Sequence, residues 1–312
     1  MANIKTIRFI NRKEIDLVKY NNLISKSKNI SIYCYAWYLD AVSDNWGVLI
    51  QGDYDVVLPI PFTIKFGLNI IYQPYFTREI TLFYDSKKEE PCLSDFINAL
   101  PKKFKQIDFN ISIKESIKDY KIKETQHQEL NLDKPYEEVY KDYSKNTKRL
   151  IKKAKKQDCI ITKTTDTEPF ILFFKQNTGK QVDYTNSHYN NLNKLTKLAL
   201  EHQKGVLYQV LVENRTVAYG YYLLQDHRIT YLKGSATEEG KKIGAMFLLM
   251  NTVIEENCHQ SKVFDFGGSK IESIAQFYAK FGAKNRNYYS YSKNEHSWLI
   301  KKGKNIRDFL KK

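Results

Sequence analysis

The spacing of apolar residues is most regular in the second half of the 312-residue chain. There, three apolar and aromatic runs follow one another with turns of two or three residues, which predicts an antiparallel meander. Apolar positions at helical spacing predict helices before and after it. The expected strands are Val206–Val212, Thr216–Gln225, Arg228–Ser235, Lys262–Gly267 and Asn287–Tyr291. The expected helices are Tyr136–Tyr143, Lys145–Gln157, Pro169–Lys180, Tyr189–His202, Ile243–Asn257 and Ile271–Phe281.

The first half also mixes helical and strand patterns, so the chain as a whole is expected to be α+β. We expect helices at Arg12–Lys26, Tyr35–Val42 and Cys92–Leu100, and strands at Trp46–Gln51, Val56–Pro61, Leu68–Tyr72, Ile80–Phe83 and Gln106–Ile111. A helix restarts after Leu132, where Asp133 suits an N-cap and Pro135 suits a first turn. This restart, together with the length, predicts two domains, 1–132 and 133–312.

Composition narrows the class of protein. The chain is 42% hydrophobic and 14% aromatic, which excludes intrinsic disorder, and its net charge of +15 favours an anionic partner. No apolar run approaches the roughly 20 residues of a membrane span, and basic residues interrupt the N-terminus where a secretory signal would be apolar. The four cysteines lie far apart and the six histidines show no metal spacing. We therefore expect a cytoplasmic protein with reduced thiols and no metal site.

A candidate phosphate site lies in the loop Ala236–Gly244, between the third meander strand and the expected helix from Ile243. Two glycines there allow close approach of a ligand, and a helix start offers free N–H groups. Lys241 and Lys242 add positive charge. The alternative is a solvated turn that begins a core helix.

A strongly basic helix is expected over Lys145–Gln157, with Leu150, Ile151 and Ala154 as its narrow apolar stripe. Its face is either merely solvated or a contact for an anionic acceptor or a nucleic-acid backbone. The cations are Lys145, Lys148, Arg149, Lys152, Lys153, Lys155 and Lys156.

Several motifs resemble those of GNAT acyltransferases, and in particular of their Fem-like branch. Lys241–Met246 aligns with the phosphate-loop pattern Q/R-x-x-G-x-G/A. The central glycine is kept as Gly244. Lys241 stands in place of Gln/Arg, and Met246 stands in place of the last small residue. Tyr278–Ala283 is similar to the Y-x-K-x-G-F stretch of GNAT enzymes. Phe264–Ser269 resembles the Fem-like D-F-G-G segment, and Ser144–Lys156 the segment that opens their second domain. The resemblance covers Tyr136–Ser292 well and the first half loosely.

This resemblance implies two tandem GNAT-like domains, each a mixed, mainly antiparallel sheet flanked by helices. It also implies roles for particular residues. Tyr278 would protonate the leaving group, unless its ring only packs on the sheet, and Asp183 would accept a proton from the acceptor amine. Donor binding is expected at Lys233, Ser235, Gly240, Lys241, Lys242, Ile243 and Gly244. Substrate binding is expected at Arg149, Tyr184, Asp265, Gly267 and Gly268, although Asp265 is interpreted first as a turn former.

The expected activity is N-acyl transfer by direct attack of an amine, with no permanently bound cofactor and acyl-CoA as co-substrate. The acceptor would be a small molecule or a cell-envelope precursor. One alternative donor is aminoacyl-tRNA, as in Fem enzymes that build peptidoglycan bridges; the lack of a long helical arm favours acyl-CoA. The other alternative is a non-catalytic module that binds polyanions. The sequence leaves the oligomeric state open.

Overall fold

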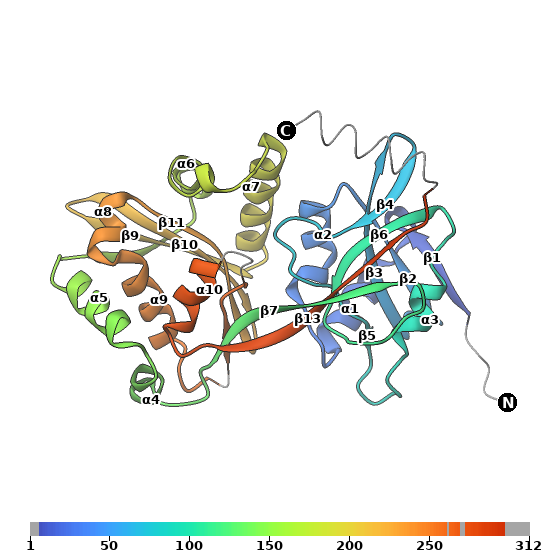
Figure 1. Cartoon of the computed structure of the whole chain (residues 1–312), viewed down its shortest axis with the longest axis horizontal. Helices are drawn as coiled ribbons and strands as arrows, with labels where there is room; N and C mark the ends of the chain where they lie inside the picture. Colours follow the sequence, from blue (N-terminus) through green and yellow to red (C-terminus); the bar gives the residue numbers. More distant parts are fainter. Residues whose placement is uncertain (1–5, 261, 269–271, 297–312) are drawn as a thin grey trace. The chain divides into compact units, whose positions relative to one another are not determined.

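The computed structural model describes residues 6–260, 262–268 and 272–296. The chain divides into two compact units, the first comprising Met1–Thr125 with Tyr288–Lys312 and the second Gln126–Asn287 (Figure 1). This division differs from the predicted domains 1–132 and 133–312, because the segment after Asn287 returns to the first unit. The physical reason is strand pairing: Tyr289–Asn294 is hydrogen-bonded antiparallel to Gln106–Ile111.

The first unit is a mixed, mainly antiparallel sheet with helices. Its strands run in the order β1-β2-β3-β4-β6-β13, with β5 paired to β3, and only β4 and β6 are parallel neighbours. The strands are β1 (Ile7–Asn11), β2 (Asn45–Gln51), β3 (Val56–Lys65), β4 (Leu68–Tyr72), β5 (Phe83–Tyr84), β6 (Phe104–Ile111) and β13 (Lys284–Asn294). The helices are α1 (Leu17–Lys26), α2 (Ala36–Val42) and α3 (Leu93–Asn98).

The second unit has the same kind of sheet, in the order β7-β12-β11-β10-β9-β8, with β11 and β12 parallel and the other neighbours antiparallel. Its strands are β7 (Lys121–Asn131), β8 (Ile160–Thr164), β9 (Gly205–Val212), β10 (Arg215–Gln225), β11 (Arg228–Ala236) and β12 (Val263–Asp265). Its helices are α4 (Tyr136–Lys141), α5 (Lys145–Lys155), α6 (Thr167–Asn177), α7 (Asn186–Glu201), α8 (Glu238–Ile243), α9 (Ala245–Glu255) and α10 (Glu272–Ala279). The predicted α+β class and the meander β9–β10–β11 are confirmed.

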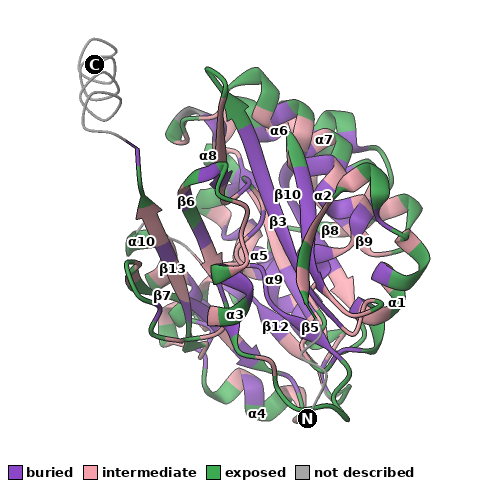
Figure 2. Cartoon of the chain, turned by 90° about the vertical axis from the view of Figure 1, so that its right-hand side faces the viewer, coloured by how far each residue is buried: buried purple, intermediate pink, exposed green. Residues whose placement is uncertain are grey.

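Helices cover both faces of the second sheet. Tyr221 of β10 faces α6 and α7, since its ring stacks on Phe170 and its hydroxyl donates to the carbonyl of Thr196. The next residue, Tyr222, points to the other face and joins the core with Leu249 of α9. Figure 1 shows α6 and α7 on one side of this sheet and α5, α9 and α10 on the other. The central strands β3 and β10 are drawn as buried over most of their length in Figure 2.

Several elements differ from the predictions. Three strands were not expected, namely β1, the polar β7 and the short edge strand β8, and the predicted strand Ile80–Phe83 is reduced to a bridge at Ile80 and to β5. The expected loop Ala236–Gly244 is largely helix α8, and the expected helix from Ile243 begins instead at Ala245. Ser269 of the expected D-F-G-G segment and Ile271, the expected start of α10, lie outside the described residues.

Among the described residues, no helix has both the length and the apolar character that crossing a bilayer requires.

Candidate functional site

The central feature of the candidate site is the place where β11 and β12 part. The two strands pair only through Arg228, Ile229 and Thr230, opposite Val263, Phe264 and Asp265. Beyond Thr230, no described strand pairs with β11 on that side, although β11 continues to Ala236. The register with β10 also shifts here, because Tyr221 pairs with Lys233 and Tyr222 with Tyr231, so that Leu232 forms a bulge. Bulges re-aim side chains and are common beside active sites.

Two glycines turn the chain away at the end of β12. Gly267 and Gly268 have φ values of +76° and +71°, a region that favours glycine. A Cβ on Gly267 would lie 2.8 Å from the Tyr231 carbonyl oxygen. The Gly267 amide donates to Asp265 at 2.9 Å, which is the turn-forming role expected of this aspartate. The glycines thus bring the chain close to β11 just where the strands part.

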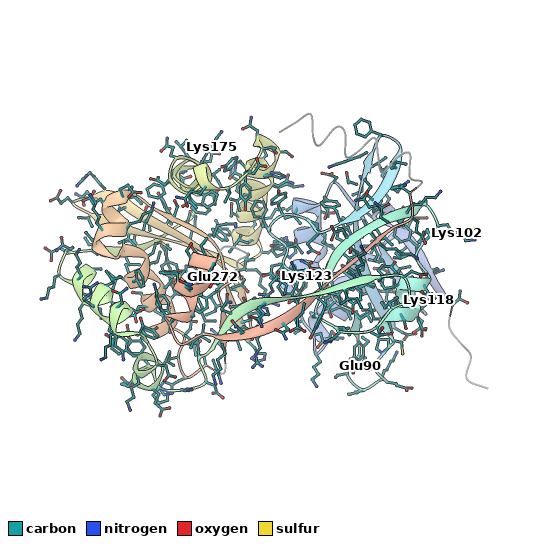
Figure 3. All side chains as sticks on the ribbon, in the orientation of Figure 1. Glu90, Lys102, Lys118, Lys123, Lys175 and Glu272 are labelled. Atoms are coloured by element: carbon teal, nitrogen blue, oxygen red, sulfur yellow. The ribbon has the colours of Figure 1, made fainter. Side chains whose placement is uncertain are left out.

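Tyr278 of α10 lies beside this opening. Its side chain is 6% exposed, and its ring packs 4.9 Å from that of Phe266 and 6.2 Å from that of Tyr231. Burial, followed by the negative charge of Asp265, raises the pKa of Tyr278 well above its ordinary value, so the hydroxyl stays protonated at neutral pH. No hydrogen bond joins this hydroxyl to another described residue. It is therefore available to donate to a ligand. Glu272, labelled in Figure 3, marks the first turn of the same helix.

The opposite face of β11 carries polar side chains next to α6 and α7. The Ser235 hydroxyl is 2.6 Å from that of Thr178, the residue that ends α6. The ammonium of Lys233 lies 5.6 Å from the centre of the Tyr184 ring, and burial lowers the pKa of Lys233 to about 8. Burial also raises the pKa of Tyr184 to about 12. The predicted residues Lys233, Ser235 and Tyr184 are thus brought together on this face.

An ion-pair network holds the base of the opening. Arg228 Nη1 bonds Glu129 of β7 and, at 2.7 Å, the fully buried Asp265. His127 Nε2 lies 2.9 Å from Glu129 Oε1. Burial alone would raise the pKa of Glu129, but the His127 hydrogen bond and the Arg228 charge lower it to about 2. His127, Glu129 and Asp265 have the donor types of a metal site, with ligand atoms within 4.8 Å of one another, but the guanidinium already supplies positive charge to both carboxylates.

The stretch expected to bind phosphate is folded differently. The amides of Gly240, Lys241 and Gly244 donate to the Thr237 hydroxyl, the Thr237 carbonyl and the Gly240 carbonyl, respectively. A Cβ on Gly240 would lie 2.3 Å from the Val217 carbonyl oxygen, and one on Gly244 would lie 2.9 Å from that of Leu150. Both glycines are therefore needed for internal packing, and these three amides are already hydrogen-bonded.

Of the two lysines of that stretch, Lys241 is ion-paired, whereas Lys242 is exposed and its carbonyl, rather than its ammonium, is hydrogen-bonded to another described residue. Lys241 pairs with Glu238 at 2.7 Å, the Lys242 carbonyl accepts from Lys153, and Ile243 ends α8. Two glutamates, Glu238 and Glu239, occupy the first turn of α8.

Two further predicted residues lie apart from the opening. Asp183 is exposed in the turn before α7 and has no hydrogen bond or ion pair with another described residue. Arg149 is exposed on α5, where it donates to Asn146 at 2.8 Å. It lines an open basic groove on that helix, together with Lys145, Lys148, Lys152, Lys153 and Lys156.

The sequence reasoning missed the residues that act through distant partners, namely Arg228, Glu129, His127, Thr178 and Tyr231. Arg228 lies at the start of a predicted strand, but nothing in its local sequence points to Glu129 or Asp265. The bulge at Leu232 was not foreseen either.

Known proteins share the fold of this chain. Residues 141–278 match the family model described as an acetyltransferase (GNAT) domain. The fold is similar to that of FemX, with a TM-score of 0.65 and 11% identity over 91% of this chain and 96% of that one.

Two other solved structures share the fold at lower similarity. One is a tandem GNAT protein from the clavulanic acid biosynthesis pathway, with a TM-score of 0.53 and 8% identity over 93% of this chain and 98% of that one. The other is L-PGS from Bacillus licheniformis, with a TM-score of 0.51 and 9% identity over 82% and 86%. No curated protein matches the chain in sequence. The parting of β11 from β12 and these likenesses agree: residues 141–278 match a GNAT acetyltransferase domain, and the chain has a GNAT-like fold that is similar to that of FemX.

Proposed function

We propose that the chain is an N-acyltransferase in which the acceptor amine attacks the acyl group of the donor directly. The observation that carries the proposal is the protonated hydroxyl of Tyr278, available beside the point where β11 parts from β12. Expulsion of a thiolate or alkoxide is easier with a positioned proton donor, and such a donor typically contributes about 100- to 10,000-fold. No covalent enzyme intermediate is required.

The two faces of β11 support separate roles for donor and acceptor. The donor's reacting carbonyl would lie at the open edge of β11 after Thr230, where the main chain has no described strand partner on that side. Its leaving group would face Tyr278. The acceptor, a small molecule or an envelope precursor, would approach from the α6–α7 face past Tyr184. Catalysis would then come mainly from positioning the two reactants.

For the donor we propose two carriers, and a different observation favours each. The stronger one favours aminoacyl-tRNA: the open basic groove on α5 suits a phosphate backbone, whereas the Gly240–Gly244 amides that would cradle the pyrophosphate of coenzyme A are hydrogen-bonded within the chain.

Acyl-CoA remains the second carrier. It is favoured by the open edge of β11, which could bind an extended acyl arm. It is also favoured by the likeness to the tandem GNAT protein, whose structure is described as the form without AcCoA. A donor bound mainly through its acyl arm would need little help from the stretch 240–244.

The test is a binding and transfer screen on the full chain. Acetyl-CoA, longer acyl-CoAs, free CoA and aminoacyl-tRNA are compared by thermal shift, because a ligand that binds only the folded state stabilises it by mass action. Each is then tested for transfer of a radiolabelled acyl group to a panel of amines. The α5 variant replaces Lys148, Arg149, Lys152 and Lys156 by glutamine. Its control replaces four cations of the first unit, namely Lys87, Lys102, Lys118 and Lys123, the last three labelled in Figure 3.

Aminoacyl-tRNA as donor predicts salt-dependent binding that falls at least tenfold in the α5 variant and not in the control, with acyl transfer to an amine. Stabilisation by an acyl-CoA, unaffected by the α5 substitutions, would select acyl-CoA. Polyanion binding without acyl transfer from any donor would contradict the proposed activity and favour a binding module.

A further inference from the structure

Lys233 is the titratable side chain of β11 that faces α6 and α7. It pairs with Tyr221 of β10, and partners directly opposite each other in an antiparallel pair point to the same face. Tyr221 contacts α6 and α7 through Phe170 and Thr196. Lys233 therefore lies on the face opposite to Tyr231 and Tyr278, on the side from which the acceptor would enter.

The surroundings of Lys233 are aromatic. Its ammonium lies 5.6 Å from the centre of the Tyr184 ring, and that ring packs in turn against Phe174 at 6.2 Å and Tyr189 at 5.7 Å. Ser235, two residues along the strand, is buried on the same face and hydrogen-bonded to Thr178. The rings remove water from around the ammonium, and burial is the cause that lowers the pKa of Lys233 to about 8.

The titratable groups on this face come from β10, α6, α7 and the turn before α7. They are Tyr219, Tyr221, Lys175, Asp183, Tyr184, His188 and Tyr189. Lys175 lies 5.3 Å from the Tyr189 ring and adds positive charge. Asp183 is exposed to water, unlike the partly buried Lys233. By strand register, Arg228 and the Asp265 carboxylate that it binds also point to this face, further along the strands, whereas Tyr278 of α10 packs with Tyr231 on the opposite face.

We propose that Lys233 Nζ is the general base that takes the proton from the acceptor ammonium, the role that the sequence had suggested for Asp183. This inference rests on the proposed acyltransferase function. A base must be positioned on the acceptor side, close to the attacked carbonyl. Lys233 directly follows the bulge at Leu232, in the part of β11 that is no longer paired with β12. Asp183 lies on the same side, in the turn before α7, but it is exposed to water and does not belong to the strand that opens.

The proposed step balances as follows. Neutral Lys233 takes one proton from the ammonium, and the freed lone pair of the amine forms the C–N bond with the acyl carbon. The bond from that carbon to the leaving oxygen or sulfur breaks, and the leaving group takes the Tyr278 proton. The proton that the amine nitrogen sheds on forming the amide returns to Tyr278 through water. Lys233 releases its proton to solvent, so that one amide, one alcohol or thiol and one proton are produced.

The first test needs no substrate. The full chain is labelled with acetic anhydride across pH 6–11, and the extent of modification at each lysine is read by mass spectrometry. Lys163 is the matched reference, because it is also a strand lysine over a tyrosine ring, 5.2 Å from Tyr208, but is exposed. We expect the labelling midpoint of Lys233 to lie near pH 8, below that of Lys163. A Lys233 midpoint equal to that of Lys163 would overturn the inference.

The second test uses the transfer reaction with Lys233→Met, Lys233→Arg and the control Lys163→Met. We expect kcat/KM of the wild type to rise about tenfold between pH 7 and pH 9, as the neutral form of Lys233 increases. In Lys233→Met and Lys233→Arg, kcat/KM should fall about 100- to 10,000-fold, because neither side chain supplies a neutral base. The rise of kcat/KM between pH 7 and pH 9 should disappear in both variants. Lys163→Met should match the wild type.

The outcomes separate the base role from the proposed function. Activity retained in Lys233→Arg would mean that only the positive charge matters and would overturn the base role while leaving acyl transfer intact. A labelling midpoint near pH 8 without transfer from any donor would overturn the proposed function, and the base role with it.

Discussion

Arg228 is the residue whose replacement should weaken the second unit most clearly. It bonds Glu129 and Asp265, whose side chains are 14% and 0% exposed, while its own side chain is 31% exposed. Arg228→Met keeps much of the aliphatic contact but leaves two carboxylates without their shared cation. Breaking a buried ion pair by removing one partner costs about 3–5 kcal/mol. Because Arg286 remains 3.6 Å from Glu129 and the Gly267 amide still bonds Asp265, we expect the lower end, about 3 kcal/mol.

The measurements are urea unfolding and thermal unfolding of the full chain at pH 7, both monitored by circular dichroism. For a domain of this size, a loss of about 3 kcal/mol lowers Tm by about 6–12 °C. The matched control is Arg215→Met at the start of β10, because Arg215 also has two carboxylate partners, Glu213 and Glu239, but is 62% exposed. An exposed pair contributes at most about 1 kcal/mol. Equal losses in the two variants would refute the view that the network at Arg228 is a buried anchor.

Three further predictions concern pH, packing and charge. The pKa of Glu129 is lowered from 4.5 to about 2, so its stabilising contribution of about 3 kcal/mol should be present above pH 4.5 and be lost as pH falls towards 2. In Glu129→Gln, the free energy of unfolding should therefore depend less steeply on pH in this range. Gly244→Ala should cost about 2–4 kcal/mol in urea unfolding, since φ is +87° and the Cβ would meet a carbonyl at 2.9 Å, whereas Gly67→Ala, at φ +72° in open space, should cost about 1–2 kcal/mol. Replacing Lys152 and Lys156 by glutamine should reduce the slope of log K against log salt for tRNA by about 1–2 in filter binding.

The apolar periodicity predicted most of the second unit, because its elements bury one face against a common sheet. The meander strands and the helices around them lie within a few residues of the expected bounds. β7 was missed because its sequence, Lys121–Asn131, is polar and mixes exposed with buried positions. Its partner in the sheet, β12, is distant in sequence, so no local pattern indicated that the two strands pair.

Parts of the candidate site could not be predicted either, because they depend on contacts between residues that are distant in sequence. Gly240 and Gly244 were predicted as loop glycines that allow close approach of a ligand. Only the positions of the Val217 and Leu150 carbonyls show that they are packing glycines. The lowered pKa of Lys233 comes from burial, and Tyr184, whose ring lies beside the ammonium, is far from Lys233 in sequence. Tyr278, by contrast, was predicted as a candidate because it lies in a local motif on a single helix.

The measurement that tests the central claim most directly is single-turnover acyl transfer by Tyr278→Phe, with whichever donor the screen identifies. The substitution removes the hydroxyl and keeps the ring that packs on Phe266 and Tyr231. We expect the transfer rate to fall about 100- to 10,000-fold, with donor affinity and Tm unchanged. A transfer rate equal to that of the wild type would contradict the role of Tyr278 as the proton donor.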